Sequence, residues 1–288
     1  MTLGNLLLLL ASAGVHVITH IALKRSRDRS AFVGWMLLWA AILFSPILLL
    51  IRAPIPPIGW GLMLFSSVFE AGYFIAIALA YRGADLSVVY PLARGTGPVL
   101  LLVWSALILR EPLTVGGGMG VALIGLGIYV INLPRLGAWR QPIAALRQSG
   151  PRWALAAGAC ISGYTAIDKV GIGYVPPLLY TYLALWITLL WVGAWTVWYV
   201  GGRGLRDEWR LSRGGIVVAG FTTVSAYGLV LLAMAGGTPA SYAGAIREVS
   251  VVLGAAYGVF ALKEQGGPMR LAGAGLVAAG VAAIGLLG

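Results

Sequence analysis

The stretch LSVVYPLARGTGPVLLLVWSALILRE, residues 86–111, aligns without a gap with PASYAGAIREVSVVLGAAYGVFALKE, residues 239–264. The alignment pairs Arg94 with Arg247 and Glu111 with Glu264. Arg94 and Arg247 both stand inside runs that are otherwise apolar, and chance would rarely place two such residues in register. We therefore infer that the chain contains an internal repeat, which changes the meaning of every other position.

The composition surrounding this repeat indicates an integral membrane protein. Of 288 residues, 60% are hydrophobic and only 10% are charged, with a mean hydropathy of +0.91, whereas soluble domains carry about a quarter charged residues. The net charge of +11 does not point to nucleic acid, because the basic residues lie in short gaps between apolar runs. The one cysteine, Cys160, excludes an intrachain disulfide, and no zinc-site spacing is present, so we expect no cofactor.

The apolar runs predict an all-α integral membrane fold with ten transmembrane helices. A bilayer core needs about 20 helical residues to cross, and an open sheet cannot satisfy its backbone in lipid. The longest gap, 134–150, separates a first five-helix unit (1–133) from a second (151–288), and we expect it to be a cytoplasmic linker. The predicted spans are 3–23, 32–51, 58–81, 86–109, 113–133, 151–172, 176–200, 213–235, 239–262 and 268–288.

Five helices per unit is an odd number, so the second copy enters the membrane upside down relative to the first. This predicts an inverted repeat with a pseudo-two-fold axis in the membrane plane, as in many secondary transporters. Arg94 and Arg247 would then enter from opposite faces and converge near the middle of the bilayer.

Orientation follows from the basic residues, which concentrate in the loops after the odd-numbered spans. The opposite face holds Arg52, Arg110 and Lys169. By the positive-inside rule the odd-numbered loops are cytoplasmic and both termini lie outside. The expected location is a bacterial inner membrane.

An arginine inside the membrane costs at least about 2.5–3.5 kcal/mol on insertion scales, so it faces a partner or a wet cavity. Arg94 and Arg247 are therefore candidate substrate-binding residues. The structural alternative is an ion pair in which Arg247 contacts Glu248 or Glu70. The two interpretations are compatible, because a charge in a cavity needs a partner when no ligand is bound.

Several other polar residues lie at similar depth. His16 and His20, spaced i and i+4, share a helix face and could carry protons, bind substrate or hold a metal, or simply pack. Glu70 is a candidate coupling carboxylate, with an ion-pair role as the alternative. His20 and Asp168 lie closer to helix ends. The candidate ligand-contacting tyrosines, which could equally belong to the interfacial aromatic belt, are Tyr73, Tyr90, Tyr164, Tyr227 and Tyr242.

Glycines also follow a pattern in the fifth span. Gly116 and Gly120, with neighbouring glycines, form a small-xxx-small face. Such a face is typical of close helix contact in membranes, so its expected role is structural.

The end of each half resembles the EamA repeat of the drug/metabolite transporter superfamily. The marks are Pro91 in the fourth span, Glu111 after it and its mate Glu264. The resemblance covers nearly the whole chain as two five-helix units. It implies a secondary carrier of small metabolites, such as amino acids or phosphorylated compounds, working by alternating access. Two departures are Gly244, where the mate of Pro91 would fall, and a charge bias opposite to the one usual in this family.

The expected mechanism is a rocking of the two repeats about a central site where Arg94 and Arg247 attract a carboxylate, phosphate or phosphonate. Glu70, Glu248 and His16 would neutralise the arginines in the empty site, and one of them would bind a proton. Glu111 and Glu264, beside basic residues at helix ends, are expected to make gate contacts. The substrate would be anionic or zwitterionic, and the protein a monomer or a homodimer.

Three other functions remain open at the level of sequence. A small multidrug antiporter would exchange protons for lipophilic cations through a glutamate in the first span, where this chain has His16 and His20. A membrane enzyme could use those histidines with Asp168, although no nucleophile motif or metal spacing supports it. A channel or scaffold needs no charged centre.

Overall fold

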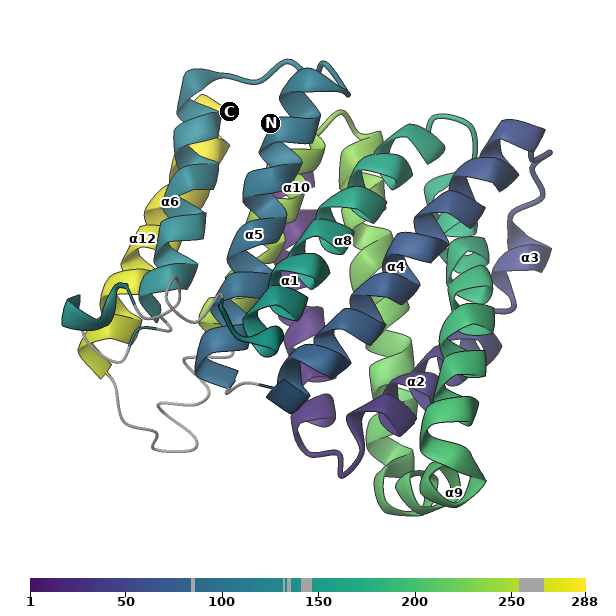
Figure 1. Cartoon of the computed structure of the whole chain (residues 1–288). Helices are drawn as coiled ribbons and strands as arrows, with labels where there is room; N and C mark the ends of the chain where they lie inside the picture. The colour runs from purple at the N-terminus through teal and green to yellow at the C-terminus, as the bar shows by residue number, and fades with distance from the viewer. Residues whose placement is uncertain (84–85, 132, 134–135, 141–146, 254–266) are drawn as a thin grey trace.

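The computed structural model describes residues 1–83, 86–131, 133, 136–140, 147–253 and 267–288 (Figure 1). Within these ranges the regular structure is helical, which confirms the all-α prediction. The first half contains α1 (Leu3–Lys24), α2 (Arg29–Leu43), α3 (Ile47–Leu50), α4 (Pro57–Gly83), α5 (Leu86–Leu107) and α6 (Val115–Ile131). A short 3-10 turn, η1 (Leu136–Ala138), precedes the second half, which contains α8 (Ser149–Gly171), α9 (Pro177–Ala235), α10 (Ala240–Arg247) and α12 (Gly267–Leu287).

Local residues explain where the first helices begin and end. The Thr2 hydroxyl accepts a hydrogen bond from the Asn5 amide at the start of α1, and Asp28 caps α2 by accepting from the Ala31 amide. The predicted span 32–51 is divided, because α2 ends at Leu43 and α3 starts only after Pro46. Proline has no amide hydrogen to continue the helix ladder, so it favours a break at this point.

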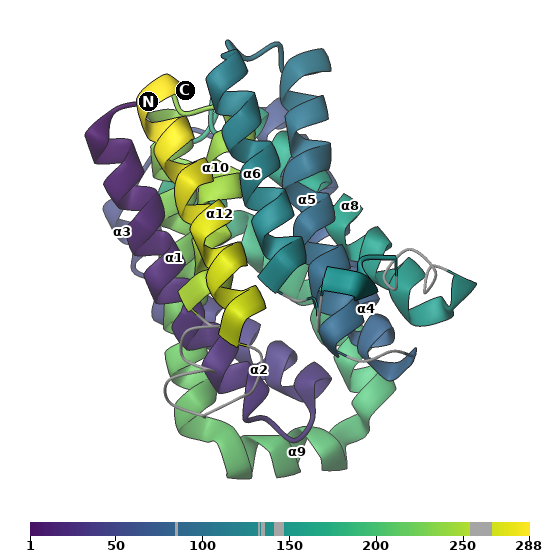
Figure 2. The same cartoon turned by 90° about the vertical axis from the view of Figure 1, so that its left-hand side faces the viewer.

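The predicted seventh and eighth spans are parts of one continuous element. α9 runs from Pro177 to Ala235, with a single non-helical residue at Gly201 (φ 73°, ψ 166°). Glycine adopts positive φ without steric cost, which makes it the natural residue for this bend. Figure 2 shows α9 descending, crossing one end of the molecule and rising again. The predicted loop between these spans is therefore helical.

The predicted ninth span is interrupted inside the membrane. α10 ends at Arg247, and the Glu248 amide donates to Ala245 O at 3.0 Å, which is the tighter i to i−3 pattern. Helix resumes over residues 249–253, and 254–262 lie outside the described residues. The break occurs at the arginine and glutamate themselves, and interrupted membrane helices are common at transporter sites.

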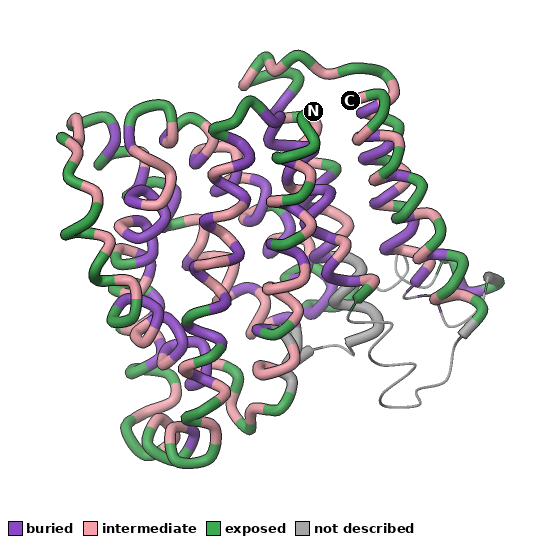
Figure 3. The backbone as a smooth tube through the Cα atoms, turned by 180° about the vertical axis from the view of Figure 1, so that it is seen from behind, coloured by how far each residue is buried: buried purple, intermediate pink, exposed green. Residues whose placement is uncertain are grey.

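The helical body has an apolar exterior. Leu107, Trp198 and Leu286 are 72–83% exposed, and green exposed positions run along the outer faces in Figure 3. Five helical segments in the described residues are long and apolar enough to cross a bilayer: Leu3–Leu23, Arg29–Leu50, Pro57–Ala80, Pro177–Ala235 and Pro268–Leu287. These segments support a membrane protein, while the count of ten crossings stays a prediction.

The two halves pack in an equivalent way. α6 and α12 lie side by side and run in opposite directions (Figure 1). A Cβ placed on Gly120 would lie 2.7 Å from Gly280 O, and one placed on Gly127 would lie 2.7 Å from Gly273 O. The internal repeat pairs Gly120 with Gly273 and Gly127 with Gly280, so exchanging the halves converts one contact into the other. This is the symmetry expected of an inverted repeat, and it confirms close helix contact at Gly120.

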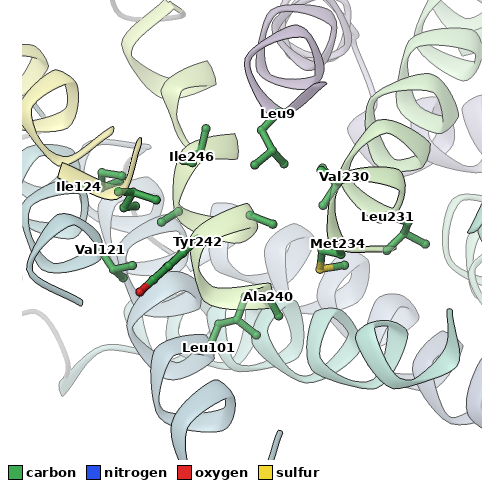
Figure 4. Close-up of a cluster of buried hydrophobic side chains, with 14 of the residues drawn as sticks. Leu9, Leu101, Val121, Ile124, Val230, Leu231, Met234, Ala240, Tyr242 and Ile246 are labelled. Carbon is green, nitrogen blue, oxygen red and sulfur yellow. The ribbon is translucent and has the colours of Figure 1, made fainter. Parts of the chain in front are cut away.

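The interior between these helices is apolar. Leu9, Leu101, Ile124 and Ile246 belong to a buried cluster contributed by α1, α5, α6 and α10 (Figure 4). α1 packs against α9, and α4 packs against α8 and α9. Several of the polar residues predicted to be functional line a cavity among these helices.

Candidate functional site

A cavity of about 770 Å³ opens between the two halves of the molecule. It extends from Arg94 and Arg247 to the loop between α1 and α2, where Arg27, Asp28 and Ser30 line it. Its inner wall is formed by polar and aromatic side chains from α1, α4, α5, α8, α9 and α10: His16, Thr19, Glu70, Tyr73, Arg94, Tyr164, Thr223, Tyr227 and Arg247.

Arg94, from α5, is 3% exposed, and its guanidinium contacts Glu248, just after α10, and His16 of α1. Its Nη1 donates to Glu248 Oε1 at 2.9 Å, and its Nη2 lies 3.3 Å from His16 Nε2. Because a guanidinium can only donate, this Nε2 is the acceptor of the contact. The contact with Glu248 joins the first repeat to the second across the centre of the molecule.

Arg247, the last residue of α10, has a different environment. It is 7% exposed, its Nη2 donates to the Tyr164 hydroxyl at 3.4 Å, and its Cζ lies 5.8 Å from the Tyr227 ring centroid. Among the described residues, its Nε has no hydrogen-bond partner. The structural alternative, an ion pair of Arg247 with Glu248 or Glu70, is not among the contacts of the described residues in this conformation. Glu248 pairs with Arg94, and Glu70 accepts a hydrogen bond from Thr188.

Three tyrosines predicted to contact the ligand line the cavity together. The rings of Tyr73 and Tyr164 are 6.5 Å apart between centroids, and those of Tyr164 and Tyr227 are 5.9 Å apart, both edge to face. This is the usual arrangement of paired aromatic rings. Since the rings adjoin the Arg247 guanidinium, the site combines a cation with an aromatic wall.

Glu70, from α4, lines the same cavity. Its Oε2 accepts a hydrogen bond from Thr188 Oγ1 at 2.5 Å. Thr188, from the first arm of α9, has no distinguishing signal in the sequence. Glu70 thus places a carboxyl group on the same cavity wall as the two arginines.

Asp168 is more central than its position near a helix end predicts. It is 2% exposed, and its carboxylate accepts hydrogen bonds from Ser66, Tyr180 and Tyr227. Ser66 and Tyr180 were not identified from the sequence. The one available signal was that Ser66 lies four residues before Glu70, on the same face of α4.

Glu111 follows α5 at the end of the molecule opposite the α1–α2 loop (Figure 1), and its gate role stays a prediction. Its two carboxylate oxygens accept from the Ala240 amide at 3.0 and 2.8 Å, which caps the start of α10. Lys169 Nζ lies 3.5 Å from Glu111 Oε1 and also donates to Met234 O and Thr238 O. These residues do not line the cavity, and they join α8, α9 and α10 beyond its inner end.

Of four other predicted residues, one lies away from the site and three have side chains that the structure does not describe. Tyr242 points away from the cavity into the cluster of Figure 4, where its hydroxyl accepts from the Thr114 amide at 3.0 Å. Tyr90 and His20 belong to α5 and α1, but their side chains lie outside the described part of the chain, as does the whole of Glu264. The described residues contain no group of three or more potential metal ligands.

Comparison with known proteins adds the family. The model of the EamA-like transporter family matches residues 2–133 and 148–286, once for each repeat. A solved protein crystal structure superposes with a TM-score of 0.72 at 15% identity, covering 100% of this chain and 98% of the other, so the fold is shared. No curated protein matches. Two family matches that together span almost the entire sequence show that the chain belongs to the EamA-like transporter family, within the drug/metabolite transporter superfamily.

Proposed function

We propose that this protein is a secondary transporter that moves a small anionic or zwitterionic metabolite by alternating access. Membership of a transporter family supports transport rather than catalysis. The observation that carries the substrate class is Arg247, a buried arginine on the cavity wall whose Nε has no partner among the described residues.

The two arginines have different roles in this proposal. Arg94 already has the Glu248 carboxylate at 2.9 Å, whereas the hydrogen bond from Arg247 is long and goes to an uncharged acceptor, the Tyr164 hydroxyl. An arginine fork binds a carboxylate, phosphate or phosphonate through two parallel hydrogen bonds. The substrate anion therefore binds at Arg247, and Arg94 keeps Glu248 in place.

Glu70 favours a zwitterion within this class. A substrate ammonium group would find its carboxylate on the same cavity wall, and the aromatic rings of Tyr73 and Tyr227 would contact the substrate body. The cavity of about 770 Å³ fits a small molecule of this kind.

The cavity reaches the α1–α2 loop, and the contacts of Glu111 and Lys169 lie beyond its other end. With the odd-numbered loops in the cytoplasm, the conformation is open to the cytoplasm, in a bacterial inner membrane. Rocking of the repeats would break the Glu111 contacts and close the side that is open here.

Thermal unfolding of the detergent-purified protein tests this function. The panel contains amino acids, dicarboxylates, inorganic phosphate, alkylphosphonates and the lipophilic cation tetraphenylphosphonium. A ligand that binds only the folded protein stabilises it by mass action, by about 2.7 kcal/mol at a hundredfold excess over Kd. We expect an anionic or zwitterionic compound to raise Tm, Arg247→Gln to abolish the rise, and the exposed control Arg206→Gln to preserve it.

The opposite pattern would overturn the proposal. If tetraphenylphosphonium alone raises Tm, and Arg247→Gln responds as the wild type does, the arginine is structural and a drug antiporter is the better description.

A further inference from the structure

Asp168 is a buried carboxylate for which the transport site described above gives no role. It contacts three hydroxyl groups from two other helices: Ser66 of α4, and Tyr180 and Tyr227 of the first and second arms of α9. With 2% exposure, it is shielded from water in this conformation. A carboxylate buried in a membrane protein is costly and needs an explanation.

The partners of Asp168 suit both of its protonation states. A hydroxyl carries one donor hydrogen and two acceptor lone pairs and can rotate. The three hydroxyls can therefore all donate to the carboxylate, or one can accept the proton of the carboxylic acid while the others donate. Glu248 differs, because its partner Arg94 can only donate.

Asp168 also lies between the cavity and the closed end of the protein. On one side its partner Tyr227 lines the cavity and places its ring 5.8 Å from the Arg247 guanidinium carbon. On the other side the next residue, Lys169, contacts Glu111 and two backbone carbonyls at the closed end. Asp168 is therefore linked both to the cavity and to the closed end, the two regions that must rearrange during alternating access.

The charged and titratable groups around Asp168 come from the elements that pack against α8, of which α5 carries Arg94 on the cavity wall. α4 contributes Glu70, one turn from Ser66, and α9 contributes Tyr180 and Tyr227. Arg247 of α10 lies across the Tyr227 ring, and Lys169 follows on α8 itself. No described arginine or lysine hydrogen-bonds to the Asp168 carboxylate, so no fixed cation keeps it ionised.

The surroundings favour a proton over a metal cation. Asp168, Ser66 and Tyr180 do not line the cavity, and their oxygens already contact one another. A sodium ion would need space and several additional oxygen ligands. A proton needs neither.

We propose that Asp168 is the proton-binding site that couples the proton gradient to transport. This inference rests on the proposed transport function. When the end held by Glu111 and Lys169 opens, the Asp168 carboxylate takes a proton from water on that side. When the side facing the cavity opens, the O–H bond breaks and the proton leaves to cavity water by way of the Tyr227 hydroxyl, restoring the carboxylate.

The test measures how readily the closed end opens, by the labelling of a cysteine placed there, so it needs no known substrate. Cys160→Ala removes the native thiol, and Ser241→Cys introduces a reporter at the closed end, where Ser241 is fully buried. The protein is reconstituted in lipid vesicles and labelled with a hydrophilic maleimide across a pH series. Val115→Cys, 83% exposed, corrects for the pH dependence of the thiol reaction.

We expect the corrected labelling of the reporter to change with pH. A tenfold difference in proton affinity between the two conformations changes their ratio tenfold across the titration. Asp168→Asn should make the corrected labelling independent of pH, and Tyr227→Phe, which keeps the ring, should displace the titration midpoint. The exposed carboxylate variant Asp207→Asn should titrate as the wild type does.

Three results would contradict the proposal. The first is that Asp168→Asn titrates like the wild type and Tyr227→Phe leaves the midpoint unchanged. The second is that labelling follows the sodium concentration rather than pH, and the third is that the reporter reacts equally at every pH. A reporter that never reacts under any condition, together with a panel in which no compound raises Tm, would instead count against the transport function itself.

Discussion

The buried ion pair of Arg94 and Glu248 leads to a prediction about the free energy of unfolding. Removing one partner of a buried ion pair leaves the other charge uncompensated, at a cost of about 3–5 kcal/mol, whereas neutralising both is far less costly. We expect Arg94→Gln and Glu248→Gln each to destabilise the protein, and the double variant to be more stable than either single one. Unfolding in mixed micelles with added dodecyl sulfate measures the three free energies.

Asp207→Asn, an exposed carboxylate change, is the control and should have little effect. Additive losses in the double variant would mean that the two side chains do not interact in the folded protein.

The burial of Arg94 and Arg247 was predictable from the sequence, but the partners of these side chains were not. Two arginines in apolar runs are visible in a single chain because their insertion cost has to be met. The choice of Glu248 by Arg94 depends on how α5 and the interrupted ninth span are rotated, which a one-dimensional pattern does not contain. Asp168 was underestimated for the same reason: its three hydroxyl partners come from distant segments.

At the scale of elements, the contact between α6 and α12 is sensitive to a single methyl group. A Cβ on Gly127 would lie 2.7 Å from Gly273 O, whereas one on Gly118 of the same helix would meet nothing within 4 Å. Overpacking costs about 1–3 kcal/mol, while alanine is favoured over glycine in a helix by up to about 1 kcal/mol. We expect Gly127→Ala to lower Tm and Gly118→Ala to leave it equal or higher.

The test is the difference in Tm between Gly127→Ala and Gly118→Ala, two variants of the same helix. Equal Tm values for both would show that α6 and α12 do not pack at these glycines in the membrane protein.

The lengths of the apolar runs predicted where helices lie better than prolines and charged residues predicted where helices break. Breaks at proline were expected between spans, yet Pro46 divides a predicted span, and Pro91 lies within the unbroken α5. Conversely, the charged segment expected to be a loop continues α9, because only Gly201 departs from helical geometry. A stretch of arginines at the end of a membrane protein can remain helical, since its side chains reach water.

For the whole molecule, the proposed orientation predicts which end of the protein faces the cytoplasm and which end is accessible from outside the cell. Ser30 lines the cavity mouth, and Val115, the first residue of α6, lies at the opposite end of the molecule (Figure 1). In cells carrying the Cys160→Ala background, we expect Val115→Cys to react with a membrane-impermeant maleimide added outside. Ser30→Cys should react only after the membrane is permeabilised.

Reversed accessibility would place the termini in the cytoplasm, which is the usual charge bias of the family, and the observed cavity would then open outward. The fold itself would be unaffected, because the two family matches and the shared architecture do not depend on orientation.

The charged groups buried at the centre of the molecule have an electrical consequence. Arg94 and Arg247 are two cations, and Glu70, Glu248 and Asp168 are three carboxyl groups, so with every group ionised the carboxylates exceed the arginines by one. A proton on Asp168 balances the set, and a bound zwitterion leaves it balanced. A transport cycle that carries one zwitterion and one proton would therefore move a single positive charge, and the membrane voltage would contribute about 2.3 kcal/mol to it for every 100 mV.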